Sequence, residues 1–289
     1  MMRRLLTVLV GFMCCLAAPG TPPHAMAEQQ STLSVQARPL SSITVQAADG
    51  SSIVALPFAA AMRFSPRSGR QPDPGAAERG LAGVRASVLV LYGVPTTVTQ
   101  RQLIDLSARL ATFCTAPLIL LAPTGAASAS GHERALIAGA SRIRWLAFGR
   151  RAAIPSGVVD VHVLPREPHT HARTLAVVHV KVPYMDVGVA YQVAQEAVKT
   201  HPPEEDVLIV DLDQLRVDDL SSHTLSMLDP GMAIIIDGAQ RLRKQAELTE
   251  FADRLYEMWI DVYTVDSSAP LVVTADARGV ILPLHGRHA

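Results

Sequence analysis

Four histidines and one aspartate lie within 20 residues of each other, in the stretch from Asp160 to His179. His169 and His171 are two residues apart, a spacing that on a β-strand places both imidazoles on one face. Imidazole nitrogens in such a pattern suit zinc or copper. His162, His169, His171 and His179 therefore form a candidate metal site. The alternative is a solvated loop, which two prolines in the same stretch favour.

A second candidate site follows the apolar run 207–210, where Asp211 and Asp213 stand two residues apart. Such a run predicts a buried strand, and carboxylates at the carboxyl edge of a parallel sheet can hold Mg²⁺ and a phosphate. The run also resembles the first motif of haloacid-dehalogenase-type phosphatases, which implies a Mg²⁺-dependent phosphoesterase using the two aspartates. A structural alternative is that they cap the turn after the strand.

Two proline-containing corners follow apolar runs that we expect to be strands. The first corner is Val94-Pro95, and the second is Val182-Pro183-Tyr184. Proline suits the start of a helix because its fixed φ fits there and its missing N–H needs no partner. We treat both corners as candidate contact points for a protein partner.

Apolar runs and helical spacing predict alternating strands and helices after residue 85. The Val94-Pro95 and Val182-Pro183 corners are 88 residues apart, and later runs keep nearly the same offset, which suggests two copies of a β-α-β-α-β unit. The expected strands are 88–92, 118–121, 145–148, 158–164, 177–182, 207–210 and 233–236, and the expected helices begin at Thr99, Ser130 and Asp186 or span 248–258.

These patterns predict an α/β protein with a first unit at 85–165 and a second at 166–289. Residues 28–84 are expected to form a separate N-terminal arm, with a short hairpin turning at Asp49-Gly50. The arm ends in a proline- and glycine-rich linker that cannot bury a core.

The first 27 residues, Met1 to Ala27, have the pattern of a secretory signal peptide. Two arginines precede an apolar run, and Ala25-Met26-Ala27 supplies small residues for cleavage. The run is shorter than a membrane span needs, so we expect a protein in the periplasm with no membrane anchor after cleavage. The remaining chain keeps one cysteine, Cys114, which cannot form an internal disulfide.

The first strand and its corner, Tyr92-Gly93-Val94-Pro95 through Ala122, resemble the TrbC family of F-type conjugative pilus assembly. The stretch Val177 through Asp213 carries a weaker resemblance. The resemblance implies tandem thioredoxin-like units without reactive cysteines. It also implies a non-catalytic part of a conjugation or type IV secretion apparatus, whose partners are other envelope or secretion-system proteins.

Composition narrows the possible functions further. The chain has a formal net charge of +0, and only 4% of its residues are aromatic. A nucleic-acid partner is therefore not expected, because neither an electrostatic footprint nor stacking platforms are present. We expect no organic cofactor, with zinc or copper as the alternative. A small-molecule-binding protein with its ligand between two lobes is a further possibility.

Overall fold

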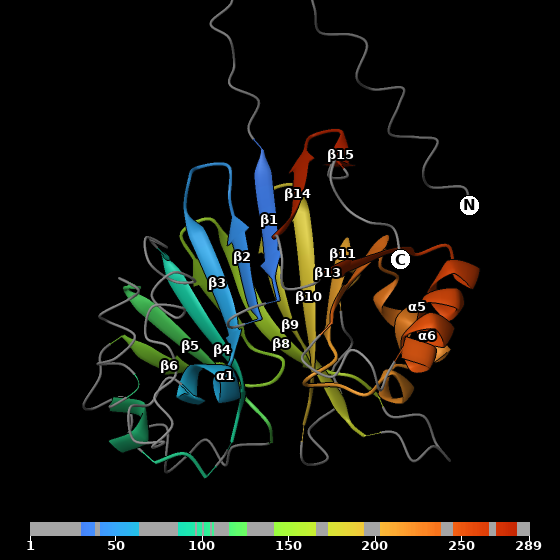
Figure 1. Cartoon of the computed structure of the whole chain (residues 1–289). Coiled ribbons are helices and arrows are strands. Elements are labelled where there is room, and N and C mark those ends of the chain that lie inside the picture. The colour runs from blue at the N-terminus through green and yellow to red at the C-terminus, as the bar shows by residue number, and fades with distance from the viewer. Residues whose placement is uncertain are drawn as a thin grey trace, which may run out of the picture.

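The computed structural model describes residues 30–37, 41–63, 86–95, 97–99, 101–104, 106, 116–125, 142–165, 173–193, 203–237, 245–265 and 270–281. Its strands form two sheets that lie face to face (Figure 1). Outside the described ranges lie the predicted signal peptide, the predicted linker, His169, His171 and Cys114.

The larger sheet has eight strands in the order β15-β14-β1-β2-β3-β4-β5-β6. Neighbours from β3 to β6 are parallel, and the others are antiparallel. The strands are β1 (Ser31–Gln36), β2 (Ser42–Gln46), β3 (Ser52–Pro57), β4 (Val88–Val94), β5 (Leu118–Pro123), β6 (Ile143–Trp145), β14 (Leu271–Asp276) and β15 (Gly279–Ile281).

The smaller sheet has seven strands in the order β13-β12-β11-β10-β9-β8-β7. Strands β10 to β13 are parallel, whereas β7 to β10 form antiparallel pairs. The strands are β7 (Arg151–Ile154), β8 (Gly157–Val163), β9 (Leu175–Val182), β10 (Met185–Gln192), β11 (Val207–Asp211), β12 (Met232–Ile236) and β13 (Asp261–Val265).

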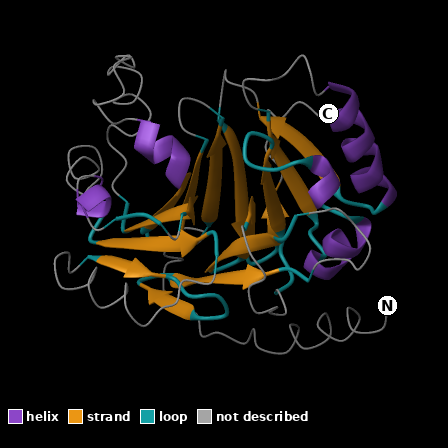
Figure 2. Cartoon of the chain, turned by 90° about the horizontal axis from the view of Figure 1, so that it is seen from below, coloured by secondary structure: helices purple, strands orange, loops and turns teal. Residues whose placement is uncertain are grey.

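Helices lie on the outer faces of this sandwich, which therefore has four layers (Figure 2). Helix α1 (Phe58–Arg63) packs on the larger sheet, while α5 (Ser222–Leu228) and α6 (Gln245–Glu257) pack on the smaller one, beside the short 3-10 helix η1 (Val217–Asp219). The inner faces of both sheets share one apolar core. Alternate residues of each strand thus point into the core or towards the helices.

Several predictions from the sequence are confirmed. The protein is mixed α/β, and the predicted apolar runs form β4, β5, β8, β9, β11 and β12. The Asp49-Gly50 turn joins β2 to β3, with Gly50 at a φ of +82°. The predicted cap at Thr99 is also present, because its backbone N–H donates to Oε1 of Gln102 and its hydroxyl accepts from the Gln102 backbone N–H.

The helix predicted to begin at Asp186 is wrong, because Met185–Gln192 is strand β10. Val187, Val189 and Tyr191 point into the core between the sheets. Asp186 and the residues at every second position after it point to the outer face of the smaller sheet. The strand 145–148 is shifted as well, since β6 is Ile143–Trp145. The predicted helix starting at Ser130 lies outside the described residues.

The predicted duplication is also wrong. Strand β4 is followed by a parallel neighbour, β5, whereas β9 turns directly into an antiparallel hairpin with β10. The two segments in the repeated register therefore have different topologies, and the described residues do not form two tandem thioredoxin-like units.

The predicted division of the chain does not match the sheets either. Strands β1 to β3, predicted as a separate arm, pair with β14 and β4 in the larger sheet. The last two strands of the first predicted unit, β7 and β8, join β9 in the smaller sheet. Because both sheets enclose one core, the residues that the structure describes are not divided between two separate lobes.

No helix within the described ranges is long and apolar enough to cross a membrane.

Candidate functional site

A row of polar residues crosses four neighbouring strands on the outer face of the smaller sheet. In β8 and β9 the valines on either side point into the core, so Asp160 and His179 point outward. The two residues are direct partners across the strands, with Arg151 opposite Asp160 and Gly188 opposite His179. Strand register therefore brings together residues that are far apart in the sequence.

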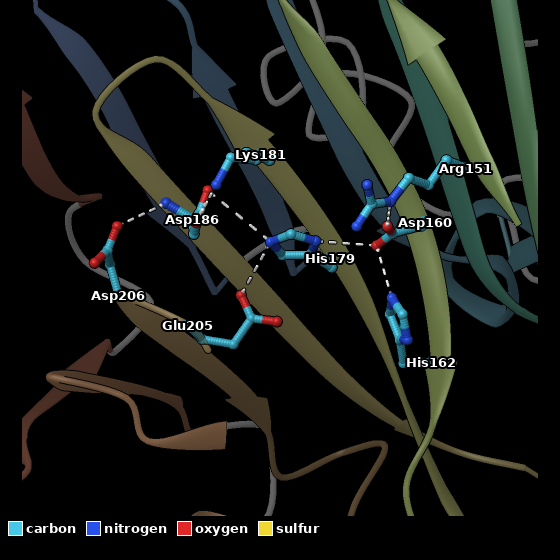
Figure 3. A network of polar contacts seen from close by, with 8 residues as sticks. All are labelled: Arg151, Asp160, His162, His179, Lys181, Asp186, Glu205 and Asp206. Atoms are coloured by element: carbon cyan, nitrogen blue, oxygen red, sulfur yellow. Dashed lines mark hydrogen bonds and ion pairs between the residues drawn. The ribbon is translucent and has the colours of Figure 1, made fainter. Parts of the chain in front are cut away.

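Asp160 is the centre of this row and is almost completely buried (Figure 3). One carboxylate oxygen lies 3.0 Å from Nδ1 of His179 and 3.2 Å from Nε2 of His162. The other lies 3.1 Å from Nε of Arg151. A buried carboxylate needs such partners, because removing it from water without them would be costly.

The partners of Asp160 keep it ionised. Burial alone would raise the pKa of this carboxyl, but the close contacts with His162 and His179, one of them the hydrogen bond to His179, hold its pKa far below the usual range. An ionised Asp160 accepts hydrogen bonds only, so the hydrogen of the His179 ring sits on Nδ1. The lone pair of a neutral His179 is then on Nε2, on the opposite side of the ring.

Glu205 lies on that opposite side, just before β11. Its side chain is fully buried, and its Oε2 is 3.7 Å from Nε2 of His179. Gly188 makes room for it, because a Cβ at position 188 would lie 2.8 Å from the Glu205 carboxyl carbon. Burial, aided by the negative charges of Asp186, Asp160 and Asp206, raises the pKa of Glu205 to about 9.

The structure brings together only part of the predicted metal site. His162 and His179 share Asp160, with ring centroids 6.5 Å apart, whereas His169 and His171 lie outside the described residues. In the described parts of the chain, no three His, Cys, Asp or Glu side chains are spaced to hold a metal ion as they stand. The imidazoles of His162 and His179 are held by a carboxylate rather than by each other.

A second group of polar residues lies between the sheets, where β4, β5, β10 and β11 end. The hydroxyl of Tyr191 donates to the carbonyl of Pro123, 3.0 Å away, and the rings of Tyr191 and Tyr92 are 5.9 Å apart. Burial and the negative charge of Asp211 raise the pKa of Tyr92. This buried edge thus combines a carboxylate with two phenols.

Asp211 and Asp213, which were predicted to act as a pair, differ in their exposure to solvent. Asp211 is fully buried and its Oδ1 accepts the backbone N–H of Asp213, whereas the Asp213 side chain is exposed. This contact is the turn cap that the structural alternative anticipated. Of the nearby aspartates, Asp218 is exposed, and Asp219 accepts hydrogen bonds from Arg173 and Gln192.

The two buried tyrosines should respond oppositely to loss of the hydroxyl. The hydroxyl of Tyr92 is buried with no hydrogen-bond partner among the described residues. Tyr92→Phe should therefore raise the free energy of unfolding by about 1 kcal/mol, whereas Tyr191→Phe should lower it by about 1 kcal/mol. Urea denaturation of both variants measures the difference, and equal effects would contradict this assignment of partners.

The two predicted corners lie at opposite ends of the sandwich strands. Val94 is buried and Pro95 exposed, at the carboxyl end of β4. Val182 is buried, while Pro183 and Tyr184 are exposed in the turn before β10. Tyr184 has a φ of 70° and the Pro183 carbonyl accepts from the hydroxyl of Ser31. Only the second corner therefore presents an exposed aromatic ring.

Sequence reasoning missed Glu205, and it assigned Asp186 only to the start of a helix. Glu205 sits between two other acids, Glu204 and Asp206, and nothing in that run distinguishes the buried member. One usable signal was Gly188 inside an apolar run, because a glycine within a strand often marks a close approach of another group.

No protein-family model matches the chain, and no curated protein matches it. Among solved structures, it is similar to a crystal structure of a diphosphatase from the PhnP family, with 9% sequence identity and a TM-score of 0.34. The match covers 71% of this chain and 85% of that chain. A TM-score this low carries no argument about function, so the roles of the sites rest on this chain's own residues.

Proposed function

We propose that this chain is an exported, non-catalytic protein that binds a protein partner through one edge of its smaller sheet. The observation that carries this proposal is Trp259, whose side chain is 94% exposed. Exposure of a whole indole to water is unusual, and tryptophan is among the residues that contribute most at protein interfaces.

The backbone at Trp259 is consistent with a functional position. It follows α6 with a φ of 61°, and the next residue, Ile260, donates its N–H to the carbonyl of Leu255. Glycine is the usual residue at such a left-handed helix end, and a bulky side chain there is strained. Strain of this kind is concentrated at functional sites.

Trp259 belongs to a larger surface, which we call the amino edge. Strands β10 to β13 are parallel neighbours, so the residues that precede them lie side by side. Exposed Tyr184 precedes β10, and half-exposed Tyr256 lies near the end of α6. The exposed acids of this edge are Glu204, Asp206, Asp229, Glu257 and Asp261.

The chemistry of the amino edge indicates the partner's chemistry. Aromatic rings bordered by carboxylates complement a surface that is apolar at its centre and carries lysines or arginines around it. The signal-peptide pattern of Met1 to Ala27 supports a periplasmic location, where such a partner would be an envelope protein. We propose that this partner belongs to a machine that assembles conjugative pili or secretes proteins.

Trp259→Gly should weaken partner binding about 30-fold, the loss expected for an interface hot spot. The same change should raise the free energy of unfolding by about 1 kcal/mol, because glycine relieves the positive φ. Affinity capture from a periplasmic extract at low and high salt, followed by affinity measurement with the recovered partner, tests the effect on binding. Urea denaturation of the variant tests the effect on stability. Val272→Thr, at a half-exposed valine of the larger sheet, is the control.

Binding should decrease with added salt and should survive Val272→Thr. A partner that binds Trp259→Gly as tightly as the unaltered protein would refute the amino edge as the binding surface.

A second candidate is a Mg²⁺-dependent phosphoesterase at the edge where β4, β5, β10 and β11 end. The burial of Asp211 beside Tyr92, at the carboxyl ends of parallel strands, favours it, because ligands of α/β proteins bind at such edges. Hydrolysis of bis-p-nitrophenyl phosphate with added Mg²⁺ should then fall at least 100-fold in Asp211→Asn. Activity that is absent, or unchanged in the variant, excludes this function.

A further inference from the structure

Two buried polar groups face each other across a gap on the outer side of β9 and β10. Nε2 of His179 and both carboxyl oxygens of Glu205 have no hydrogen-bond partner among the described residues. The separation of 3.7 Å between His179 and Glu205 is too long for a direct hydrogen bond. Oδ1 of Asp186 lies 4.0 Å from the same nitrogen (Figure 3).

The ring of His179 is oriented as a metal ligand would be. Its Nδ1 is 3.0 Å from the carboxylate of Asp160, and so its lone pair on Nε2 points into the gap. In metal sites, the ligating histidine almost always gives its other N–H to a carboxylate or carbonyl, which fixes the tautomer and the ring. Asp160 occupies that supporting position.

We propose that Nε2 of His179, the Glu205 carboxylate and Oδ1 of Asp186 bind one zinc ion. Nitrogen and carboxylate ligands suit zinc, whose bonds of about 2.0–2.2 Å place neighbouring ligands about 3.3 Å apart. The observed separations of 3.7 and 4.0 Å are wider, so the carboxylates must move inward by about half an ångström to bind. Lys181 contacts the other oxygen of Asp186 at 2.7 Å and leaves Oδ1 to the ion.

This site differs from the histidine cluster predicted from the sequence. His162 is not a ligand in it, because its Nε2 faces Asp160 and not the gap. His169 and His171 are not needed as ligands. The proposed ligands are His179 in β9, Asp186 at the start of β10 and Glu205, two residues before β11. The two possibilities can be separated by mutation.

Zinc titration of the metal-free, full-length mature protein tests the proposal. We expect one equivalent of Zn²⁺ to bind, and Co²⁺ to bind in its place with visible absorption of a low-coordinate site. Glu205→Gln, which keeps the size of the side chain, should weaken zinc binding at least 100-fold. Glu204→Gln, at the exposed neighbouring position, and the double variant His169→Ala/His171→Ala should bind zinc normally.

Circular dichroism of each variant shows whether it is folded, and so separates a lost ligand from a lost fold. The proposal is overturned if the unaltered protein binds no stoichiometric zinc, or if folded Glu205→Gln binds it as tightly. Loss of zinc in the His169→Ala/His171→Ala variant alone would place the metal on the predicted histidine cluster instead.

Discussion

Asp160→Ala should lower the free energy of unfolding by about 3–5 kcal/mol at neutral pH, the cost of breaking a buried ion-paired network. The variant leaves Nδ1 of His179 and Nε2 of His162 without their carboxylate, in surroundings that exclude water. Arg151 is largely exposed and can be hydrated, so it contributes little to this loss.

The effect of Asp160→Ala should depend on pH with a definite sign. The pKa of Asp160 is lowered in the folded protein, so its contribution to stability is present above the ordinary pKa of about 3.9 and is lost as the pH falls further. The difference between the two proteins should therefore be largest near neutral pH and shrink in acid.

Urea denaturation at pH 7 and at several acidic pH values measures this dependence. Asp218→Ala is the matched control, because Asp218 is 77% exposed and lies 3.7 Å from Arg216. An exposed pair of this kind contributes at most about 1 kcal/mol. A loss no larger in Asp160→Ala than in the control would show that the Asp160 network does not stabilise the fold.

Glu205→Gln should make the metal-free protein more stable at neutral and alkaline pH. In the unfolded chain this carboxyl ionises near pH 4.5, whereas burial and neighbouring acids raise its pKa to about 9 in the folded protein. As the pH rises between these values, the unfolded state loses a proton that the folded state keeps, so the unaltered protein becomes less stable. Glutamine removes this titration.

The gain should therefore grow with pH, from near zero at pH 4.5 to about 3 kcal/mol at pH 7. Denaturation in the presence of a chelator at pH 5, 6, 7 and 8 measures the slope. Glu204→Gln, at an exposed neighbouring carboxyl, should show no comparable slope. A gain that is independent of pH would show that Glu205 is ionised in the folded protein.

The sequence predicted the buried strands well because parallel strands covered on both faces are continuous apolar runs. The apolar runs within Val88–Val94 and Val207–Asp211 are of this kind, and their short length and β-branched residues favour a strand over a buried helix. The Asp49-Gly50 turn could be predicted equally well, because Asp-Gly between two runs of alternating apolar and polar residues is typical of a tight β-hairpin.

Strand β10 was misread for a specific reason. Val187 and Tyr191 are four residues apart, a spacing that places them on one face of a helix and also on one face of a strand. Asp186 before them looked like a helix cap, whereas its backbone N–H in fact bonds the carboxylate of Asp206. Only the intervening Val189, which is also in the core, distinguishes the two patterns.

The candidate site could be predicted only in part, because its residues meet through strand register. Asp160, His162 and His179 are close in the sequence, and their chemistry was visible there. Their pairing on one carboxylate depends on how β8 aligns with β9, and the placement of Glu205 depends on β11 joining β10. Neither alignment is encoded locally.

Photocrosslinking from position 259 in living cells tests the central claim, that an exported chain binds a partner through its amino edge. A photoreactive phenylalanine derivative in place of Trp259 should give a discrete crosslinked product in the periplasmic fraction. The same residue in place of Val272 should give none. Products of equal yield from both positions, or a chain that stays in the cytoplasm with its leader attached, would contradict the account.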